Sequence, residues 1–184
     1  MNYSLIRNFS TGDGVGLRTS VYFSGCQRAL EGKACPGCHN SVAWAADSGQ
    51  VWTDKEKETV LRSLEPDYVS GLSILGGEPL SDFNLDGVLD LAKAAKERFP
   101  KKDLWMWSGY ELKDILANVY PAKVEKVKEL LNYVDILVDG PFIQDLKNPG
   151  LKFRGSSNQK ILKIDHENNN EVIDVTNHFS PTDH

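Results

Sequence analysis

Short apolar runs alternate with helix-forming segments along most of this chain, and no other feature limits its possible folds as strongly. Apolar runs typical of buried strands occupy residues 19–24, 68–75, 104–107 and 135–138. Segments with apolar residues at helical spacing occupy 53–63, 84–99, 111–118 and 122–133. Parallel strands are buried on both faces and therefore read as continuous apolar runs. The alternation thus predicts an α/β fold with a mainly parallel sheet.

Local signals place some of the boundaries. Thr53, with Glu56 three residues later, has the pattern of a capping box at a helix start. Near the end of the chain, residues 160–165 and 171–175 alternate in polarity and predict a small β-hairpin. We therefore expect a main domain over residues 1–160, then a hairpin and tail over 161–184, of which 176–184 is a loose tail.

The composition is that of an ordinary water-soluble domain. Of 184 residues, 40% are hydrophobic and 26% are charged, and the net charge of −5 argues against a nucleic-acid-binding surface. No apolar run approaches the roughly 20 residues that span a bilayer. Residues 1–11 lack the long apolar stretch of a signal peptide. We expect a cytoplasmic protein that binds neither nucleic acid nor membranes.

All the cysteine of the chain lies in one short segment, because Cys26, Cys35 and Cys38 are the only three. An odd number would leave one thiol over in a disulfide framework. Closely spaced cysteines in a cytosolic chain usually serve metal or redox chemistry. Thiolates bind zinc, copper or the iron of an iron–sulfur cluster.

Two interpretations use only the last two cysteines. Cys35, Cys38 and His39 form the C-x-x-C-H pattern of c-type haem attachment, but that chemistry normally needs export. Cys35 and Cys38 also resemble a dithiol redox motif. Both interpretations leave Cys26 without a role.

Two further interpretations use all three cysteines. A structural zinc site needs a fourth ligand, which would be His39 or a distant histidine: His166, His178 or His184. Adjacent Cys38 and His39 do not easily reach one tetrahedral ion. Alternatively, a four-iron cluster normally takes four cysteines, so that three would leave one iron open to bind a substrate or cofactor. The cysteines alone leave these possibilities open.

Glycine-containing loops follow four of the predicted strands, at Gly25-Cys26, Gly76-Gly77, Ser108-Gly109 and Gly140-Pro141. Glycine lets a ligand approach the backbone closely, although strand-to-helix loops often contain glycine for structural reasons alone. In parallel α/β folds, ligands bind at the C-terminal ends of the strands. Four such loops, one of them with the cysteines, predict a ligand site at that edge of the sheet.

Several segments together resemble radical S-adenosylmethionine (SAM) enzymes of the glycyl-radical activating group. Segments 35–40 (CPGCHN) and 76–79 (GGEP) are similar to pieces shared across that group. Segments 107–110 (WSGY) and 154–159 (RGSSNQ) resemble, more narrowly, the family that activates anaerobic (class III) ribonucleotide reductase. Further similar segments are 12–18, 24–26, 48–50 and 138–142, with Trp44. The resemblance extends over roughly residues 1–160.

The resemblance implies a fold and a reaction. The fold would be an incomplete, laterally open (βα) barrel of the radical SAM type over residues 1–160, with the small C-terminal β-hairpin after it. Cys26, Cys35 and Cys38 would each hold one iron of a [4Fe–4S] cluster, and the fourth iron would chelate SAM. Reductive cleavage of SAM would give a radical that removes hydrogen from a glycine of the partner. The implied partners are the large subunit of anaerobic ribonucleotide reductase and a low-potential electron donor such as flavodoxin.

The resemblance also implies SAM contacts at the strand ends. Backbone groups of Gly76 and Gly77 would bind the amino group of SAM, with Glu78 shaping the turn. The other cofactor-binding residues would be Gly37, Cys38 and His39 on the adenosine side, and Ser108 and Gly109 at the ribose or methionine end. No residues suggest a general acid–base pair, and the implied mechanism needs none.

Some polar and aromatic residues have both a functional and a structural interpretation. Arg18 would face the partner or the SAM carboxylate, or would be a solvated arginine at a strand start. Asp139 and Arg154 would be site residues or members of a structural ion pair. We also expect Tyr110, Phe142 and Arg154 to lie along the opening of the barrel.

The cysteine spacing departs from the family pattern. Eight residues, 27–34, separate Cys26 from Cys35, where the family pattern has three. Doubling a loop costs only about 0.6 kcal/mol in closure entropy, and we expect a solvated bulge there.

Two alternative functions stay open. One is an activase for another glycyl-radical enzyme, such as pyruvate formate-lyase, and the other is a zinc-binding, non-catalytic interaction module.

Overall fold

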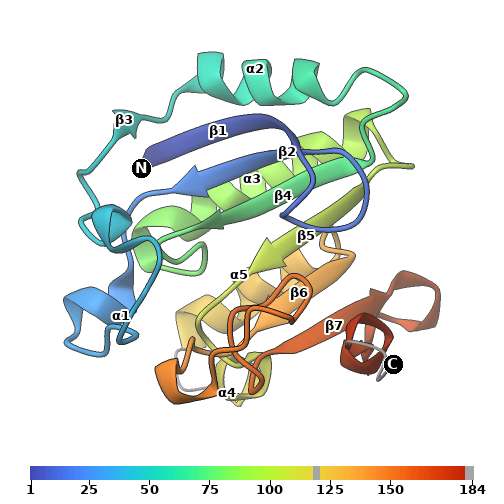
Figure 1. The fold of residues 1–184 in the computed structure, drawn as a ribbon. Helices are drawn as coiled ribbons and strands as arrows, with labels where there is room; N and C mark the ends of the chain where they lie inside the picture. The colour runs from blue at the N-terminus through green and yellow to red at the C-terminus, as the bar shows by residue number, and fades with distance from the viewer. Residues whose placement is uncertain (118–120, 181–184) are drawn as a thin grey trace.

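One open, mixed β-sheet forms the centre of the computed structural model, which describes residues 1–117 and 121–180. The eight strands of the described residues follow the order β3-β1-β2-β4-β5-β6-β7-β8. β3 and β8 lie at opposite edges, so the sheet is not closed (Figure 1). The α/β fold predicted from the sequence is confirmed.

The central strands of the sheet are parallel, as predicted: β2 (Arg18–Phe23), β4 (Gly71–Gly76), β5 (Asp103–Trp107) and β6 (Ile136–Asp139). Antiparallel strands flank them, with β1 (Asn2–Ser10) and β3 (Gln50–Val51) on one side and β7 (Lys160–Asp165) and β8 (Glu171–Asp174) on the other. The predicted hairpin is confirmed as β7 and β8. It extends the main sheet, because β7 pairs with β6.

The described α-helices are α1 (Gln27–Leu30), α2 (Asp54–Ser63), α3 (Asp82–Arg98), α4 (Leu112–Leu116) and α5 (Pro121–Leu131). Short 3-10 helices occupy Ser41–Ala43, Gln144–Leu146, His166–Asn168 and Thr176–Phe179. The capping box at Thr53 and Glu56 is confirmed at the start of α2. The helix predicted over 111–118 corresponds to α4, and residue 118 lies outside the described residues.

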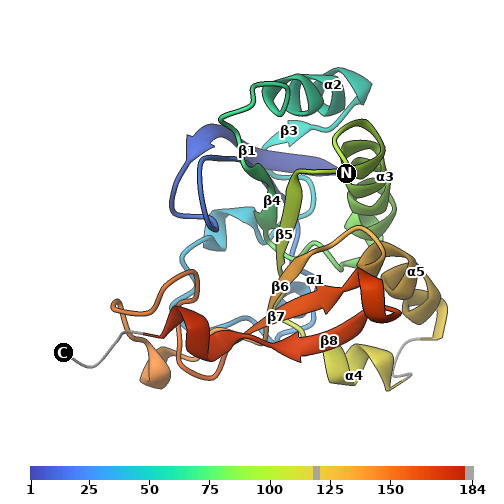
Figure 2. The same cartoon turned by 90° about the vertical axis from the view of Figure 1, so that its right-hand side faces the viewer.

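The two faces of the sheet differ in what covers them. Helices α2, α3 and α5 lie on one side (Figure 2), and the main hydrophobic core fills the space between them and the strands. Because successive side chains of a strand point to opposite faces, Leu104 and Met106 of β5 both point into this core. Trp105 belongs to a smaller aromatic cluster with Trp107, on the face that the helices leave uncovered.

The segment after β8 is ordered up to residue 180, which corrects the prediction of a loose tail from Thr176. Thr176–Phe179 is a 3-10 helix. The ring of Phe179 packs edge-on against Trp105 and Phe153, with centroids 5.8 and 5.5 Å away. Burial of this aromatic ring holds the segment on the uncovered face of the sheet. Residues 181–184 lie outside the described residues.

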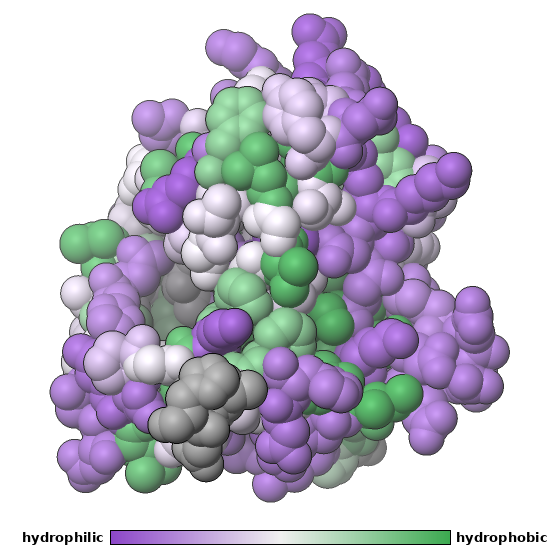
Figure 3. Space-filling model, turned by 45° about the vertical axis from the view of Figure 1, so that its right-hand side comes forward, coloured by the Kyte–Doolittle hydropathy of each residue, from purple (hydrophilic) through white to green (hydrophobic). Residues whose placement is uncertain are grey.

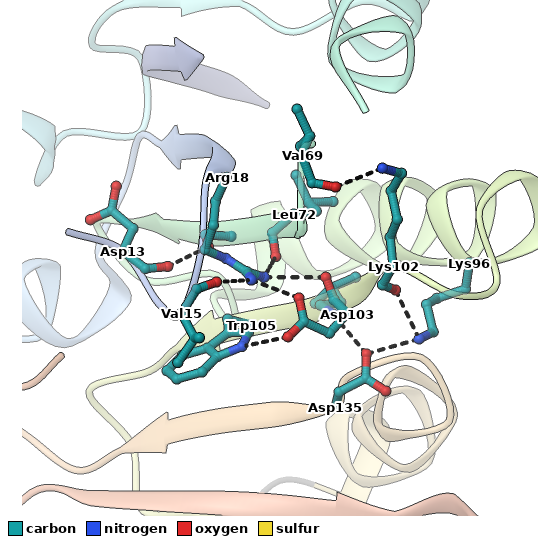
Figure 4. Close-up of polar contacts among 12 residues, drawn as sticks. Asp13, Val15, Arg18, Val69, Leu72, Lys96, Lys102, Asp103, Trp105 and Asp135 are labelled. Carbon is teal, nitrogen blue, oxygen red and sulfur yellow. Dashed lines mark hydrogen bonds and ion pairs between the residues drawn. The ribbon is translucent and has the colours of Figure 1, made fainter. Parts of the chain in front are cut away.

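Arg18 lies at the N-terminal end of β2 and is fully buried (Figure 4). Its guanidinium donates to the Asp103 carboxylate (2.6 Å), the Ser73 hydroxyl (2.7 Å) and the Leu72 carbonyl (2.9 Å). It also lies 5.5 Å from the ring centroid of Trp105. Burial lowers the pKa of Arg18, and Asp103 opposes that shift. Both sequence-based interpretations of Arg18, ligand-facing and solvated, are therefore wrong, since its hydrogen bonds join three neighbouring strands.

No helix in the described part of the chain is long and apolar enough to cross a membrane. The face shown in Figure 3 is largely hydrophilic, and hydrophobic residues interrupt it in small patches.

Replacing Asp103 by alanine is expected to lower the free energy of unfolding by about 3 kcal/mol, because it leaves the buried Arg18 guanidinium without its carboxylate. We place the loss at the low end for a broken buried pair, since the Asp103 side chain is 41% exposed. Urea denaturation of the metal-free protein measures it. Glu125→Ala, which breaks the exposed pair with Lys128, is the control and is expected to cost less than about 1 kcal/mol. Equal losses in the two variants would contradict the structural role of Arg18.

Candidate cluster and cofactor site

A cleft of about 530 Å³ lies at the C-terminal ends of the parallel strands, on the face that the helices leave uncovered. Its lining includes the cysteine segment and the loops after three strands, at Cys35, Cys38, His39, Asn40, Gly76, Gly77, Ser108, Gly109, Gly140 and Phe142. The lining also includes Asp13, Tyr22, Leu151 and residues 153–155. The strand-end prediction of a ligand site is consistent with this cleft. A depression of about 590 Å³ near residues 65–70 and 99–102 contains no cysteine.

The three thiols are free and partly exposed. Cys26 stands at the start of α1, Cys35 and Cys38 line the cleft, and the Cys38 amide donates to the Cys35 carbonyl at 3.1 Å. Burial raises the pKa of Cys26 to about 11, and the charges of Glu78 and Cys35 act in the same direction. The N–H groups of the α1 backbone oppose this rise. Among the described residues, no three His, Cys, Asp or Glu side chains are grouped so as to hold a single metal ion.

Close approach of the chain to itself requires the two glycines at the end of β4, Gly76 and Gly77. Gly76 has φ +133°, and a Cβ there would lie 2.1 Å from the Phe23 carbonyl oxygen. A Cβ on Gly77 would lie 2.3 Å from the carbonyl oxygen of Gly25. The Gly77 and Glu78 amides donate to Phe23 and Gly25, at 2.8 Å each. The glycine pair thus lets the loop that precedes Cys26 pack directly against the cleft wall.

Glu78 is a fully buried carboxylate that joins two of the strand-end loops. It accepts hydrogen bonds from the Leu80 amide (2.9 Å), the Ser108 hydroxyl (2.9 Å) and the Gly109 amide (2.7 Å). Burial raises the pKa of Glu78, and these three donors act against the rise. Ser108 and Gly109, predicted to contact SAM, line the cleft. The Ser108 hydroxyl and the Gly109 amide point toward Glu78.

Asn84 was not identified from the sequence, yet it ties the cysteine loop to the same structure. Its buried side-chain amide donates to the carbonyls of Ser24 (2.9 Å) and Glu78 (3.1 Å), and more weakly to Gly25 (3.4 Å). The only signal in the sequence is an amide on the apolar face of a predicted helix, close to its start. Such a position usually requires specific hydrogen-bond partners.

Two residues that line the cleft, Asn40 and Arg154, each have a buried side-chain nitrogen without a hydrogen-bond partner among the described residues. The Asn40 side-chain nitrogen is buried without a hydrogen bond in the described part of the chain, and Asn40 lines the cleft beside His39. The His39 ring lies 5.6 Å from the Phe142 ring, so aromatic surface and an uncommitted donor face the same space. Gly37 has φ +73° and packs against Gln144, which brings the cysteine segment against the loop after β6.

The comparisons with known proteins decide the family. The family model described as a 4Fe-4S single cluster domain matches residues 12–162. The anaerobic ribonucleoside-triphosphate reductase-activating protein of Vibrio cholerae is 36% identical over 166 residues, which cover 89% of this chain and 99% of that protein. The chain belongs to this family.

Other members of the family show similar agreement. The proteins of the same name from Escherichia coli K12 and from enterobacteria phage T4 are each 34% identical, over 163 and 161 residues. These matches cover 88% of this chain in both cases, and 97% and 93% of the relatives. No solved structure is significantly similar to the chain.

Of the other residues predicted to belong to the site, some line the cleft and others do not. Phe142 and Arg154 line the cleft, as expected for residues near an opening. Tyr110 is not among the residues that line it, and packs instead beside Arg28 and Lys123, 5.4 and 5.5 Å from its ring centroid. Asp139 and Arg154 form no ion pair with each other in the described residues. The Asp139 carboxylate accepts from the Leu112 amide at 2.9 Å, which holds the start of α4.

Replacing Asn84 by aspartate is expected to lower the free energy of unfolding by about 3 kcal/mol at pH 7, because a carboxylate would face carbonyl oxygens. Burial and the carbonyls would raise the pKa of the new carboxyl, so the deficit shrinks as the pH falls through that value. Urea denaturation at several pH values measures both effects. Asn148→Asp is the control, since Asn148 is exposed and already accepts from the Gly150 amide. A pH-independent deficit would contradict this account.

In the metal-free protein, Cys26 is expected to react with iodoacetamide about a hundredfold more slowly at pH 8 than an ordinary thiol. The reason is its pKa of about 11, against a usual value of 9.0, because only the thiolate reacts. Peptide mass spectrometry over a pH series gives the midpoint for Cys26. The same chain unfolded in urea provides the reference. A folded-state midpoint equal to the unfolded one would disprove the burial effect.

Proposed function

We propose that this chain carries a [4Fe–4S] cluster on Cys26, Cys35 and Cys38, binds and reductively cleaves SAM, and generates a glycyl radical on anaerobic ribonucleotide reductase. The observation that carries the proposal is the shared cleft. In a member of the activating-protein family, it places Cys35 and Cys38 beside Gly76 and Gly77 at one end of the parallel sheet.

The arrangement of the thiols fits a multi-iron cluster better than a single ion. A structural zinc ion needs four ligands at about 2.0–2.3 Å from one point, and the described residues offer no such group of three. A cluster takes each thiolate on a different iron, so its ligands stay separate. Cys26, Cys35 and Cys38 are free, and the family model is a single-cluster domain. Three thiolates leave the fourth iron open to SAM.

The cleft also has the chemistry that SAM requires. Its volume lies within the range of small-molecule sites. His39 and Phe142 provide aromatic surface for adenine, and Asn40 offers an uncommitted donor. Gly37 and Cys38 would complete the adenosine side. Backbone carbonyls of Gly76 and Gly77 would accept from the SAM amino group, with Glu78 fixing their turn and Ser108 and Gly109 closing the ribose or methionine end.

The reduced cluster, when bound, would supply the electron that cleaves SAM, and the resulting radical would remove a hydrogen from the target glycine. The tasks of the chain itself are to position the cluster and SAM and to exclude water. The thiols hold the cluster, the strand-end loops orient SAM, and the uncovered face of the sheet admits the glycine segment. In this proposal the open sheet is an incomplete barrel of the radical SAM type, formed mainly by residues 1–160.

The proposed partners follow from the same reaction. The radical acceptor would be the large subunit of anaerobic ribonucleotide reductase, since the similar curated proteins are named as its activators. The electron would come from a low-potential donor such as flavodoxin. Three free thiols are typical of a reducing compartment, which favours the cytoplasm. An activase of pyruvate formate-lyase is the alternative, and the names of the similar proteins favour the reductase.

Cys35→Ser is expected to abolish glycyl-radical formation on the reductase, because the cluster loses one of its three protein ligands. The protein is purified without oxygen, reconstituted with iron and sulfide, reduced, and mixed with SAM and the reductase. Electron paramagnetic resonance measures the cluster signal, its change on adding SAM, and the glycyl radical. Val42→Ala, at a 79% exposed position near the cysteine segment, is the control and should behave as wild type.

Three results would overturn the proposal. They are a colourless zinc-only protein, a cluster signal that SAM does not alter, or radical formation by Cys35→Ser at the wild-type level. Radical formation on pyruvate formate-lyase in place of the reductase would establish the alternative substrate.

A further inference from the structure

The segment between the first and second cysteines is docked at its start, whereas residues 30–33 are exposed, as expected for a solvated bulge. Residues 27–30 form helix α1. Gln27 makes most of the hydrogen bonds that join this helix to the rest of the chain. The Gln27 amide donates to the Ser81 hydroxyl (3.0 Å), and the Gln27 side-chain oxygen accepts from the Asp82 amide (3.1 Å) and the Lys123 ammonium (2.9 Å). The start of the segment is therefore fixed against the start of α3 and against α5.

Docking of α1 brings Arg28 to the loop after β5. The Arg28 guanidinium carbon lies 5.4 Å from the ring centroid of Tyr110, within the range of a cation–π contact. A Cβ placed on Gly109 would lie 3.2 Å from Arg28 Cδ and 3.3 Å from Glu78 Oε2. The cation and the buried carboxylate thus border the same point of the backbone. Any side chain at residue 109 would press against both.

The charges at this point are complementary. Glu78 is fully buried, and its hydrogen bonds in the described residues come from two amides and a hydroxyl, not from a cation. The charge of Arg28 acts to lower the pKa of Glu78, against the rise that burial causes. The Arg28 Nε is buried without a hydrogen-bond partner in the described residues. Among the described residues, its neighbours are the Tyr110 ring and the point at Gly109 that Glu78 also borders.

We propose that Arg28 is a positioning residue for SAM binding. It holds the Glu78 carboxylate and the 108–110 loop in place, and so connects the segment between the cluster ligands to the loop after β5. This inference rests on the proposed SAM site. It assigns to the start of this segment, Gln27 and Arg28, a role in shaping that site, although Arg28 itself is not among the residues that line the cleft.

The test compares three variants of the whole chain. Arg28→Gln removes the charge, Arg28→Lys keeps it, and Lys33→Gln removes a charge from the same segment at a side chain that is 65% exposed. SAM affinity is measured by calorimetry on the reconstituted protein, with iron content determined for each. We expect Arg28→Gln to bind SAM about tenfold more weakly, the scale of coupling between contacting groups. Arg28→Lys should recover part of that loss, and Lys33→Gln should match wild type.

A second measurement needs neither cluster nor SAM. The Gly109 amide donates to Glu78, so its hydrogen exchange in the metal-free protein reports how firmly the two loops are joined. We expect Arg28→Gln to speed this exchange about tenfold relative to wild type and Lys33→Gln. Arg28→Lys should lie between them. Exchange of core amides such as that of Leu91 should stay unchanged, which separates local loosening from general destabilisation.

The outcomes separate this inference from the proposed function. If wild type binds SAM and Arg28→Gln binds it equally well, with unchanged Gly109 exchange, the positioning role is disproved and the proposed function stands. If wild type does not bind SAM, both fail. Loss of iron or general unfolding in Arg28→Gln, with Arg28→Lys equally affected, would show a purely structural role and also overturn the proposal.

Discussion

The buried carboxylate of Glu78 is the interaction on which the geometry of the site depends. A carboxyl group with no exposed surface is costly to bury unless hydrogen-bond partners satisfy it. Its donors here come from its own turn at Leu80 and from the loop after β5 at Ser108 and Gly109. The Glu78 backbone carries the connection further, because its amide donates to the carbonyl of Gly25, beside the first cysteine. Through its carboxyl group and its backbone amide, this one buried residue therefore joins three loops, and moving any of them would leave buried polar groups unpaired.

A second buried charge stabilises the opposite end of the same strands. Arg18 joins β2 to Leu72 and Ser73 on β4 and to Asp103 on β5, at the ends far from the cysteines. An open sheet with helices on only one side cannot fill its other face with helix side chains. The described structure fills it with this guanidinium and with the rings of Trp105, Phe153 and Phe179. Phe153 belongs both to this packed layer and to the lining of the cleft, so the two are in contact there.

Periodicity in the sequence was sufficient to predict the central strands and helices α2 and α3, because each buries a continuous apolar run or stripe. It was insufficient for β1, whose side chains are mostly exposed or partly exposed. The strand-end rule predicted a site where a cleft now gathers Cys35, Gly76, Ser108 and Phe142. Arg18 was misassigned because its partners Ser73 and Asp103 lie 55 and 85 residues away along the chain, and no local pattern encodes such pairings. The prediction that Tyr110 lies along the opening was wrong for a related reason, since its neighbours Arg28 and Lys123 come from distant segments.

The glycines show how structural and functional demands coincide at one place. The loop before Cys26 can approach the turn after β4 only where side chains are absent, and a Cβ at Gly76 or Gly77 would clash with backbone atoms. That close contact is what brings the cysteine segment and the glycine turn into one wall of the cleft. A glycine pair after a strand is thus evidence for a ligand site only in combination with the segment that packs on it. Because backbone contacts, Asn84 and Glu78 fix the wall before any ligand arrives, binding would not have to order it, and the cost of assembling the site is met during folding.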